Sequence, residues 1–232
     1  MKTVLLTVLL PLLCLSTYAQ DFAVINDKDG YVNVRKNKDK NAPVLGRLTA
    51  TSIFTLSEDA TLKSEWVKIY LQKDRSSDLS GYIYHDRFKF LSSFGRLQIM
   101  KQDSKGCLAK NDTMSVRLNK CPFIPKQHKL VYDGNQEIAK IDGKDFWGTD
   151  GEIPKYVINE LRVTIKNQPV VIPISAYNDL YEPRFSSLRV FLAPDKTIYI
   201  ELDNSDGAGA YAVIWVIKDG VYRYRYLHNL NA

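Results

Sequence analysis

The sequence predicts an all-β protein. Beyond residue 20, the apolar residues occur in short runs rich in Val, Ile, Tyr, Phe and Thr, and Gly, Pro or Asn-Asp signals separate these runs. No segment keeps a convincing helical periodicity over several turns. The composition, 45% hydrophobic and 25% charged, is that of an ordinary globular chain. We therefore expect short antiparallel strands joined by tight turns.

The first residues have the pattern of a secretory signal peptide. Lys2 precedes an apolar run over residues 4–15, and Thr17 and Ala19 place small side chains before a cleavage point after Ala19. The apolar run is shorter than the roughly twenty residues that a membrane-spanning helix needs, and no later stretch is apolar enough to form one. We therefore expect residues 1–19 to be removed and the mature protein to be periplasmic or secreted.

The cysteines predict a disulfide. Cys14 falls within the signal peptide, and it follows Pro-Leu-Leu rather than the small residue that lipid attachment requires. Cys107 and Cys121 remain, and such a pair predicts a disulfide in an oxidising compartment. Closing a loop of about fifteen residues stabilises a protein by roughly 3 kcal/mol. The alternative is a reactive thiol, which needs a nearby base.

Residues 22–92 predict a small β-barrel. Several short strand-like runs this close together cannot stay flat with an exposed apolar face, so they are expected to curl around a core. Val34 points towards this core, Gly46 lies where a side chain would clash, and Trp66 is expected to bury its ring. The runs cover residues 24–25, 29–35, 43–48, 53–56, 65–70, 80–84 and 90–91.

Four segments of this region also resemble a known family. They are Gly-Tyr-Val-Asn-Val-Arg at residues 30–35, Val-Leu-Gly-Arg-Leu at 44–48, Trp-Val-Lys-Ile at 66–69 and Gly-Tyr-Ile-Tyr at 81–84. In this order they resemble the bacterial SH3 (SH3b) domain family over residues 22–92. The resemblance implies a targeting module that binds cell-wall peptide, polysaccharide or protein ligands and does no chemistry. The loop over residues 72–79 departs from the family because it is long and polar, so the identity of the ligand does not carry over.

Residues 94–232 predict a second β-rich domain of unknown function. About eight strand-like runs are typical of an antiparallel β-sandwich or an open barrel. Lys218-Asp219-Gly220 predicts a tight turn between the last two runs, and Pro194-Asp195-Lys196 predicts another. The runs lie at residues 96–100, 129–132, 138–141, 160–165, 169–174, 188–192, 197–202, 211–217 and 221–227.

The sequence predicts no catalytic or metal site. His85, His128 and His228 lack metal-ligand spacing, and none pairs with a cysteine in the pattern of a cysteine peptidase. The sequence also lacks a Gly-x-Ser-x-Gly elbow and a phosphate-binding loop. Asp203 to Ala210 is oxygen-rich, but its spacing does not match a calcium loop, so a hairpin turn is expected. We expect no cofactor.

Trp147, Asp150 and Glu152 are candidates for ligand binding. The indole ring could stack on a sugar beside the two acids, and two acids at a suitable separation could also cleave a glycosidic bond. The simplest alternative is a turn in which the aspartate binds its own backbone and the indole caps the end of a sheet.

Arg223 and Arg225 are the second pair of candidates. They alternate with tyrosines over residues 222–226, so one strand face is expected to carry three tyrosines and the other the two arginines. The arginine face is then either solvated or a basic strip for a polymer or protein partner.

These features together predict an exported, non-catalytic binding protein of the cell envelope, in which the SH3b module engages a peptide, glycan or protein ligand. One alternative is a cell-wall hydrolase with an unrecognised site, and another is an inhibitor or immunity-type protein. The net charge of +6 comes from scattered basic residues, and no nucleic-acid-binding module is present, so a nucleic-acid partner is not expected.

Overall fold

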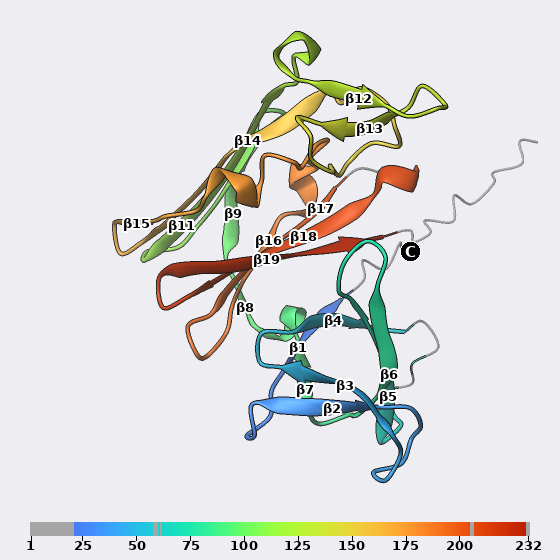
Figure 1. Ribbon diagram of the computed structural model, residues 1–232. Coiled ribbons are helices and arrows are strands. Elements are labelled where there is room, and N and C mark those ends of the chain that lie inside the picture. Colours follow the sequence, from blue (N-terminus) through green and yellow to red (C-terminus); the bar gives the residue numbers. More distant parts are fainter. Residues whose placement is uncertain (1–20, 58–59, 61, 205–206, 231–232) are drawn as a thin grey trace, which may run out of the picture.

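The computed structural model describes residues 21–57, 60, 62–204 and 207–230, and the predicted signal peptide with Cys14 lies outside these residues. The described residues form strands β1–β19 and short 3₁₀ turns, which confirms the predicted all-β class (Figure 1). In this part of the chain, no helix has the length and apolar character needed to cross a membrane.

The N-terminal strands form one antiparallel sheet with the order β3-β2-β6-β5-β4-β1-β7. The sheet curls around its own core, which includes Val34, Leu48, Phe54, Ile69 and Ile83, and we refer to it as the barrel (Figure 1). Its strands are β1 (Phe22–Ile25), β2 (Tyr31–Arg35), β3 (Val44–Thr49), β4 (Ile53–Leu56), β5 (Trp66–Gln72), β6 (Asp78–Tyr84) and β7 (Phe88–Phe90).

Two glycines allow the barrel strands to approach closely. A Cβ atom on Gly81 would lie 2.6 Å from Val34 and 2.7 Å from the carbonyl oxygen of Arg35. A Cβ atom on Gly46 would lie 2.8 Å from the side chain of Leu79. Larger residues would therefore push β2, β3 and β6 apart.

The C-terminal part is a β-sandwich. Its two main sheets have the orders β15-β14-β11-β10-β9 and β19-β18-β17-β16-β8, and a hairpin of β12 and β13 lies beside them. Side chains from both sheets interdigitate in one core that includes Val116, Leu118, Val163, Ile200 and Trp215. The strands are β8 (Gly95–Arg96), β9 (Gln98–Gln102), β10 (Gly106–Lys110), β11 (Met114–Pro122), β12 (Leu130–Tyr132), β13 (Ile138–Ile141), β14 (Tyr156–Ile165), β15 (Gln168–Val170), β16 (Arg189–Leu192), β17 (Ile198–Asn204), β18 (Tyr211–Lys218) and β19 (Val221–Asn229).

A further core joins the barrel to the sandwich, and we call it the junction core. The sheet face of β18 that points away from the sandwich interior packs against the outside of β1, where Phe22 and Val24 meet Ala212, Ile214 and Val216. Every residue of β18 before Lys218 is consequently buried. Such a continuous apolar run is expected for a strand that is covered on both faces.

The predicted alternation in β19 is wrong because the strand contains a β-bulge. The register with β18 shifts at Arg223, which is the extra residue. Tyr222 therefore packs on the sandwich core, whereas Tyr224 and Tyr226 pack on the junction core. Arg225 falls on the sandwich side, opposite Trp215 in the register, and not on a solvated arginine face.

The predicted disulfide between Cys107 and Cys121 does not form, and both thiols are free. In the register of β10 and β11, Cys107 lies opposite Leu118, so Cys121 lies three residues further along β11. At about 3.3 Å per residue this offset is roughly 10 Å, which exceeds the Cα separation of a disulfide. Cys107 belongs to the sandwich core, and burial raises the pKa of its thiol.

Replacing Cys121 by Ala is expected to change the free energy of unfolding by less than about 1 kcal/mol, because no cross-link is lost. Urea denaturation with and without a reductant measures this change. A loss of roughly 3 kcal/mol in the wild type on adding the reductant would instead reveal a disulfide.

Candidate functional site

The outward face of β2, β5 and β6 carries a row of aromatic and polar side chains. Because strands alternate, the neighbours of the buried Val34, Val67 and Ile83 point away from the core. The register places Trp66 opposite Tyr84, and it brings Arg35 opposite Tyr82. We call this surface the aromatic face, and it consists of Tyr31, Asn33, Arg35, Trp66, Tyr82 and Tyr84.

Trp66 is the centre of the aromatic face, and the expectation that it buries its ring in the core is wrong. It is only half-buried, and its ring meets the ring of Tyr84 edge to face, with centroids 5.6 Å apart and an interplanar angle of 89°. The residues that do fill the core are its neighbour Val67 and the next inward residue, Ile69. The period of two along β5 could have assigned Trp66 to the outer face from the sequence.

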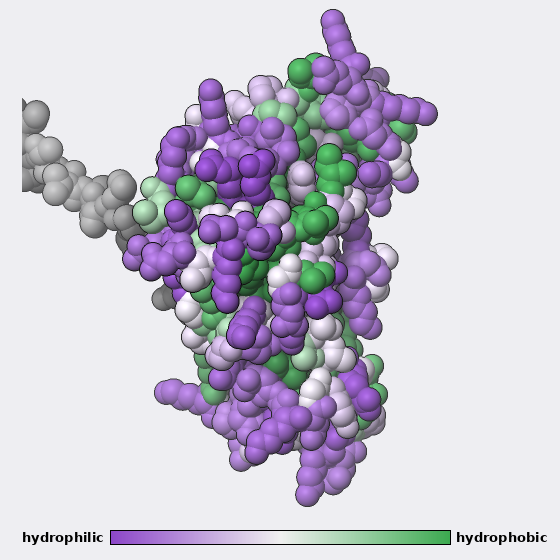
Figure 2. Space-filling model, turned by 90° about the vertical axis from the view of Figure 1, so that its left-hand side faces the viewer, coloured by the Kyte–Doolittle hydropathy of each residue, from purple (hydrophilic) through white to green (hydrophobic). Residues whose placement is uncertain are grey.

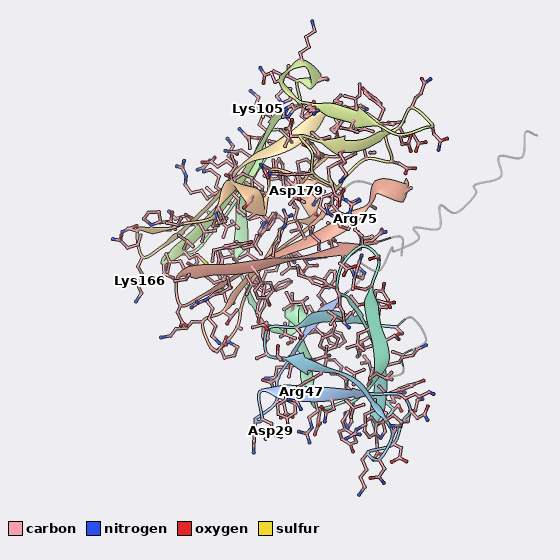
Figure 3. The ribbon with its side chains drawn as sticks, in the orientation of Figure 1. Asp29, Arg47, Arg75, Lys105, Lys166 and Asp179 are labelled. Carbon is pink, nitrogen blue, oxygen red and sulfur yellow. The ribbon has the colours of Figure 1, made fainter. Side chains whose placement is uncertain are left out.

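Cations lie over two of the tyrosine rings. The guanidinium of Arg47 lies 4.1 Å from the ring centroid of Tyr31, and the ammonium of Lys38 lies 5.5 Å from that of Tyr82. Figure 3 shows Arg47 and Asp29 at the end of the barrel that faces away from the sandwich. One face of each of these two rings thus already has a cation of the barrel over it, while Tyr31 still keeps 37% of its surface exposed.

A cleft of about 210 Å³ runs across the aromatic face. Asn33 and Trp66 line it together with Asp29 and Arg87. Arg87 also binds Asp27, and this hydrogen bond lowers the pKa of the Asp27 carboxyl. The cleft thus offers flat apolar rings for stacking beside amide, guanidinium and carboxylate groups for hydrogen bonding.

The structure places Trp147 at the contact between the sandwich and the turn at residues 73–77, which joins β5 to β6. The loop predicted over residues 72–79 is therefore shorter than expected, because Gln72, Asp78 and Leu79 belong to the two strands. Arg75 of this loop lies over the indole, 4.3 Å from the ring centroid, and donates a hydrogen bond to the carbonyl of Phe146. The indole also contacts Tyr211, with centroids 5.9 Å apart. One face of the Trp147 ring is thus already covered by a side chain of the same protein.

Asp150 and Glu152 come together in a different place. Both are exposed, and they line an open cleft of about 520 Å³ with Lys155, Glu182 and Arg184, whereas Trp147 is not among the described residues of this lining. The hydroxyl of Thr149 donates to the carbonyl of Glu152 at 2.9 Å, which is a local turn contact. The structure does not combine the acids and the indole in one cleft, and ligand binding at Trp147, Asp150 and Glu152 stays a prediction.

Arg223 and Arg225 have different surroundings. Arg225 makes a two-point ion pair with Asp179, at 2.5 and 2.6 Å, which leaves its side chain 20% exposed. Arg223 is exposed, and its guanidinium lies 3.9 Å from Asp219. They do not form one basic strip, because the bulge turns them to different sides, and a ligand role for either residue stays a prediction.

The three histidines lie in separate parts of the fold. His85 follows β6 and is exposed, while His128 pairs with Asp142 at 2.7 Å. His228 is buried at the junction core against the ring of Phe22, and burial lowers its pKa to about 4. In the described ranges, His, Cys, Asp and Glu side chains form no group of three that could hold a metal ion.

A buried charge cluster lies on the junction side of β16 and β17. One nitrogen of Arg189 binds both Glu201, at 2.6 Å, and Asp203, at 2.8 Å. Burial raises the pKa of Glu201 to about 7 and also raises that of Asp203, because a single guanidinium cannot neutralise two buried carboxylates. Asp203 was expected in a hairpin loop, but it lies at the end of β17 and its role is to pair with Arg189.

Replacing Glu201 by Gln is expected to remove a pH-dependent loss of stability. The folded protein holds the Glu201 proton up to pH about 7, whereas the unfolded chain releases it near the ordinary value of 4.5, so wild-type stability falls as the pH rises through this window. The stability of the variant relative to wild type should therefore increase from pH 4.5 to pH 7 in urea denaturation series. The titration of His228 contributes equally to the free energies of unfolding of both proteins, so it cancels in their difference. A difference that stays constant from pH 4.5 to pH 7 would contradict the raised pKa of Glu201.

The comparisons with known proteins found no match among the family models, the curated proteins or the solved structures. The bacterial SH3 resemblance therefore stays a prediction that depends on the four quoted segments.

Proposed function

We propose that the protein is an exported, non-catalytic binding protein that holds an envelope ligand on the aromatic face of its barrel. The observation that carries this proposal is the cleft at Trp66 and Tyr84, where half-exposed rings lie beside Asn33 and Arg35. The resemblance of residues 22–92 to bacterial SH3 domains supports the same conclusion, since it implies a targeting module for cell-wall ligands, and the expected signal peptide supports export.

The chemistry of the aromatic face favours a cell-wall glycan or its attached peptide. Sugar rings present flat C–H faces that stack on aromatic rings, and their hydroxyls and carboxylates need hydrogen-bond partners at the rim. Asn33 and Arg35 supply such groups beside Trp66. The net charge of +6 is compatible with attraction to an anionic wall polymer.

The sandwich supports this role by fixing the orientation of the barrel. β1 and β4 are held against β18 by the junction core, whereas no residue of the aromatic face belongs to this core. The far end of β5 does reach the sandwich, where the rings of Tyr70 and His228 have centroids 5.9 Å apart. Two hydrogen bonds add to the contact: the hydroxyl of Tyr224 donates to the carbonyl of Thr51 at 2.5 Å, and the amide of Asn229 donates to the side chain of Gln72 at 2.7 Å. Docking therefore does not cover the proposed ligand face.

Replacing Tyr31 by Ala is expected to weaken binding to purified cell-wall material about fivefold to tenfold, because one aromatic contact is lost. Co-sedimentation at increasing amounts of wall material measures the affinity. The matched control is Tyr132→Ala, since Tyr132 is also an exposed strand tyrosine but lies on the β12–β13 hairpin. Trp66→Ala is expected to weaken binding further, with its melting temperature recorded beside it.

Equal binding by the Tyr31 and Tyr132 variants would contradict the proposal. Mass spectrometry of the same supernatants tests the hydrolase alternative, because released wall fragments would show cleavage. A protein that neither binds nor cleaves the wall would shift the weight to an inhibitor or immunity-type role with a protein partner.

A further inference from the structure

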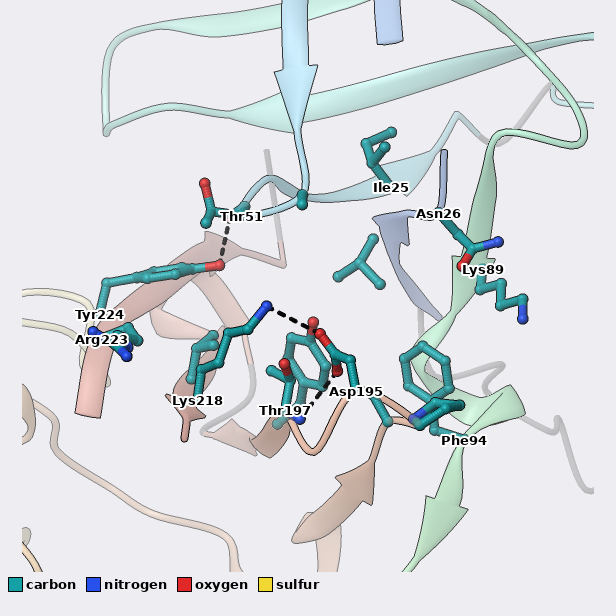
Figure 4. Close-up of a pocket in the computed structure, with 16 residues that line it drawn as sticks. Ile25, Asn26, Thr51, Lys89, Phe94, Asp195, Thr197, Lys218, Arg223 and Tyr224 are labelled. Carbon is teal, nitrogen blue, oxygen red and sulfur yellow. Dashed lines mark hydrogen bonds and ion pairs between the residues drawn. The ribbon is translucent and has the colours of Figure 1, made fainter. Parts of the chain in front are cut away.

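A pocket of about 290 Å³ lies where the barrel meets the sandwich, and both parts supply its walls (Figure 4). The barrel contributes Asn26 and Thr51, and the sandwich contributes Asp195, Lys218 and Arg223. The volume is close to the lower end of the roughly 300–1,000 Å³ typical of sites for small ligands. The pocket therefore has the size of a site for one small molecule or one terminal residue.

The inner wall of the pocket is apolar and firmly held. It consists of Val24, Val216 and Tyr199, all of which belong to the junction core and are less than 10% exposed. Phe94 stacks on Tyr199 at its edge, with ring centroids 6.1 Å apart and an interplanar angle of 17°. This wall is built from side chains fixed by packing, so it does not need to form when a ligand arrives.

The rim of the pocket is cationic. Among the described residues that line it, Lys89, Lys218 and Arg223 are positive, and Asp195 is the one carboxylate. Lys218 binds Asp195 at 3.1 Å, as Figure 4 shows. Burial raises the pKa of Asp195, but its hydrogen bonds with Thr197 and its ion pair with Lys218 outweigh burial and lower it, so Asp195 stays ionised.

We propose that this junction pocket binds a carboxylate carried on a small apolar group. The apolar part would lie against Val24, Val216 and Tyr199, and the carboxylate would lie among the cations at the rim, where positive charge exceeds negative charge. A free organic acid and the C-terminal residue of a peptide both present this chemistry. The pocket is separate from the aromatic face, so this inference does not depend on the proposed function.

Figure 2 views the molecule from the left-hand side of Figure 1 and shows hydrophilic side chains over most of this face, with apolar side chains among them mainly near its middle. An amphiphilic ligand fits the apolar wall and cationic rim of the junction pocket better than a purely polar ion does. An inorganic anion would leave the apolar wall of the pocket in contact with water.

The test is a titration of the purified protein with 3-phenylpropionate and with its neutral amide, followed by NMR chemical shifts. The acid is expected to bind with saturation in the millimolar range, which is the affinity expected for a ligand of about ten atoms, and the amide is expected to bind at least about fivefold more weakly. A tripeptide that ends in leucine, compared with its C-terminal amide, forms the second arm. Tighter binding of the peptide acid would identify a peptide terminus as the source, and tighter binding of phenylpropionate would identify a free acid.

Charge variants locate the site. Arg223→Gln and Lys218→Gln are each expected to weaken binding of the acid about fivefold to tenfold. Their matched controls are Arg162→Gln and Lys101→Gln. Each control removes an exposed cation that is paired with a nearby acid, Glu160 or Asp103, but lies outside the pocket. Asp195→Asn should increase the affinity for the acid, because it removes a negative charge from the rim while keeping an acceptor oxygen for the amide of Thr197.

Three results would overturn the proposal: no saturable binding of either acid up to about 10 mM, equal binding of acid and amide, or equal effects of the pocket variants and their controls. Tyr31→Ala should leave acid binding unchanged, which separates this pocket from the aromatic face.

Discussion

The two-sided burial of β18 is the constraint on which the rest of the structure depends. Val213, Trp215 and Ile217 face the sandwich interior, whereas Ala212, Ile214 and Val216 face the barrel. If a strand with two apolar faces lay at a solvated surface, the side chains of one face would be exposed, and the free energy gained by burying them would be lost. The barrel is therefore the cover that this sheet requires, and the position of β1 against β18 fixes which barrel surfaces remain open.

The two surfaces with ligand chemistry are consequences of that arrangement. The aromatic face consists of residues outside the junction core, and its rings at Trp66 and Tyr84 stay partly in contact with solvent. The junction pocket lies at the margin of the contact between the barrel and the sandwich, where Thr51 and Lys218 line a gap between the two parts. The first surface is the more open of the two and is suited to stacking, while the second is a partly open pocket suited to a charged group with an apolar part.

Local features of the fold could be predicted from the sequence because local rules determine them. The turn at Lys218-Asp219-Gly220 is one example: Asp219 and Gly220 both have positive φ, at 54° and 73°, as the tight turn between β18 and β19 requires. The strands at residues 31–35 and 211–217 likewise follow from short runs of β-branched and aromatic residues. The all-β class follows from the sum of such signals.

The features that could not be predicted depend on distant partners. The bulge at Arg223 depends on the register with β18, and the free thiols depend on the pairing of Cys107 with Leu118. Trp147 was a reasonable candidate for a ligand contact, but Arg75, far away in the sequence, lies over its ring. For the same reason the sequence indicated Arg223 as a binding residue without indicating the pocket that it lines.

The polar turn between β5 and β6 makes the barrel specific for the sandwich of this protein, so the barrel cannot be exchanged freely for another one. Arg75 at its tip contacts Trp147 and Phe146, while Phe22 and Ile53 on other barrel strands pack against the outer face of the sheet that contains β18. A barrel grafted onto another protein would expose these apolar side chains, and a turn without Arg75 in place of residues 73–77 would remove the guanidinium that lies over the Trp147 indole. A chimera that places another small β-barrel here must therefore carry over the matching surface of its neighbour as well.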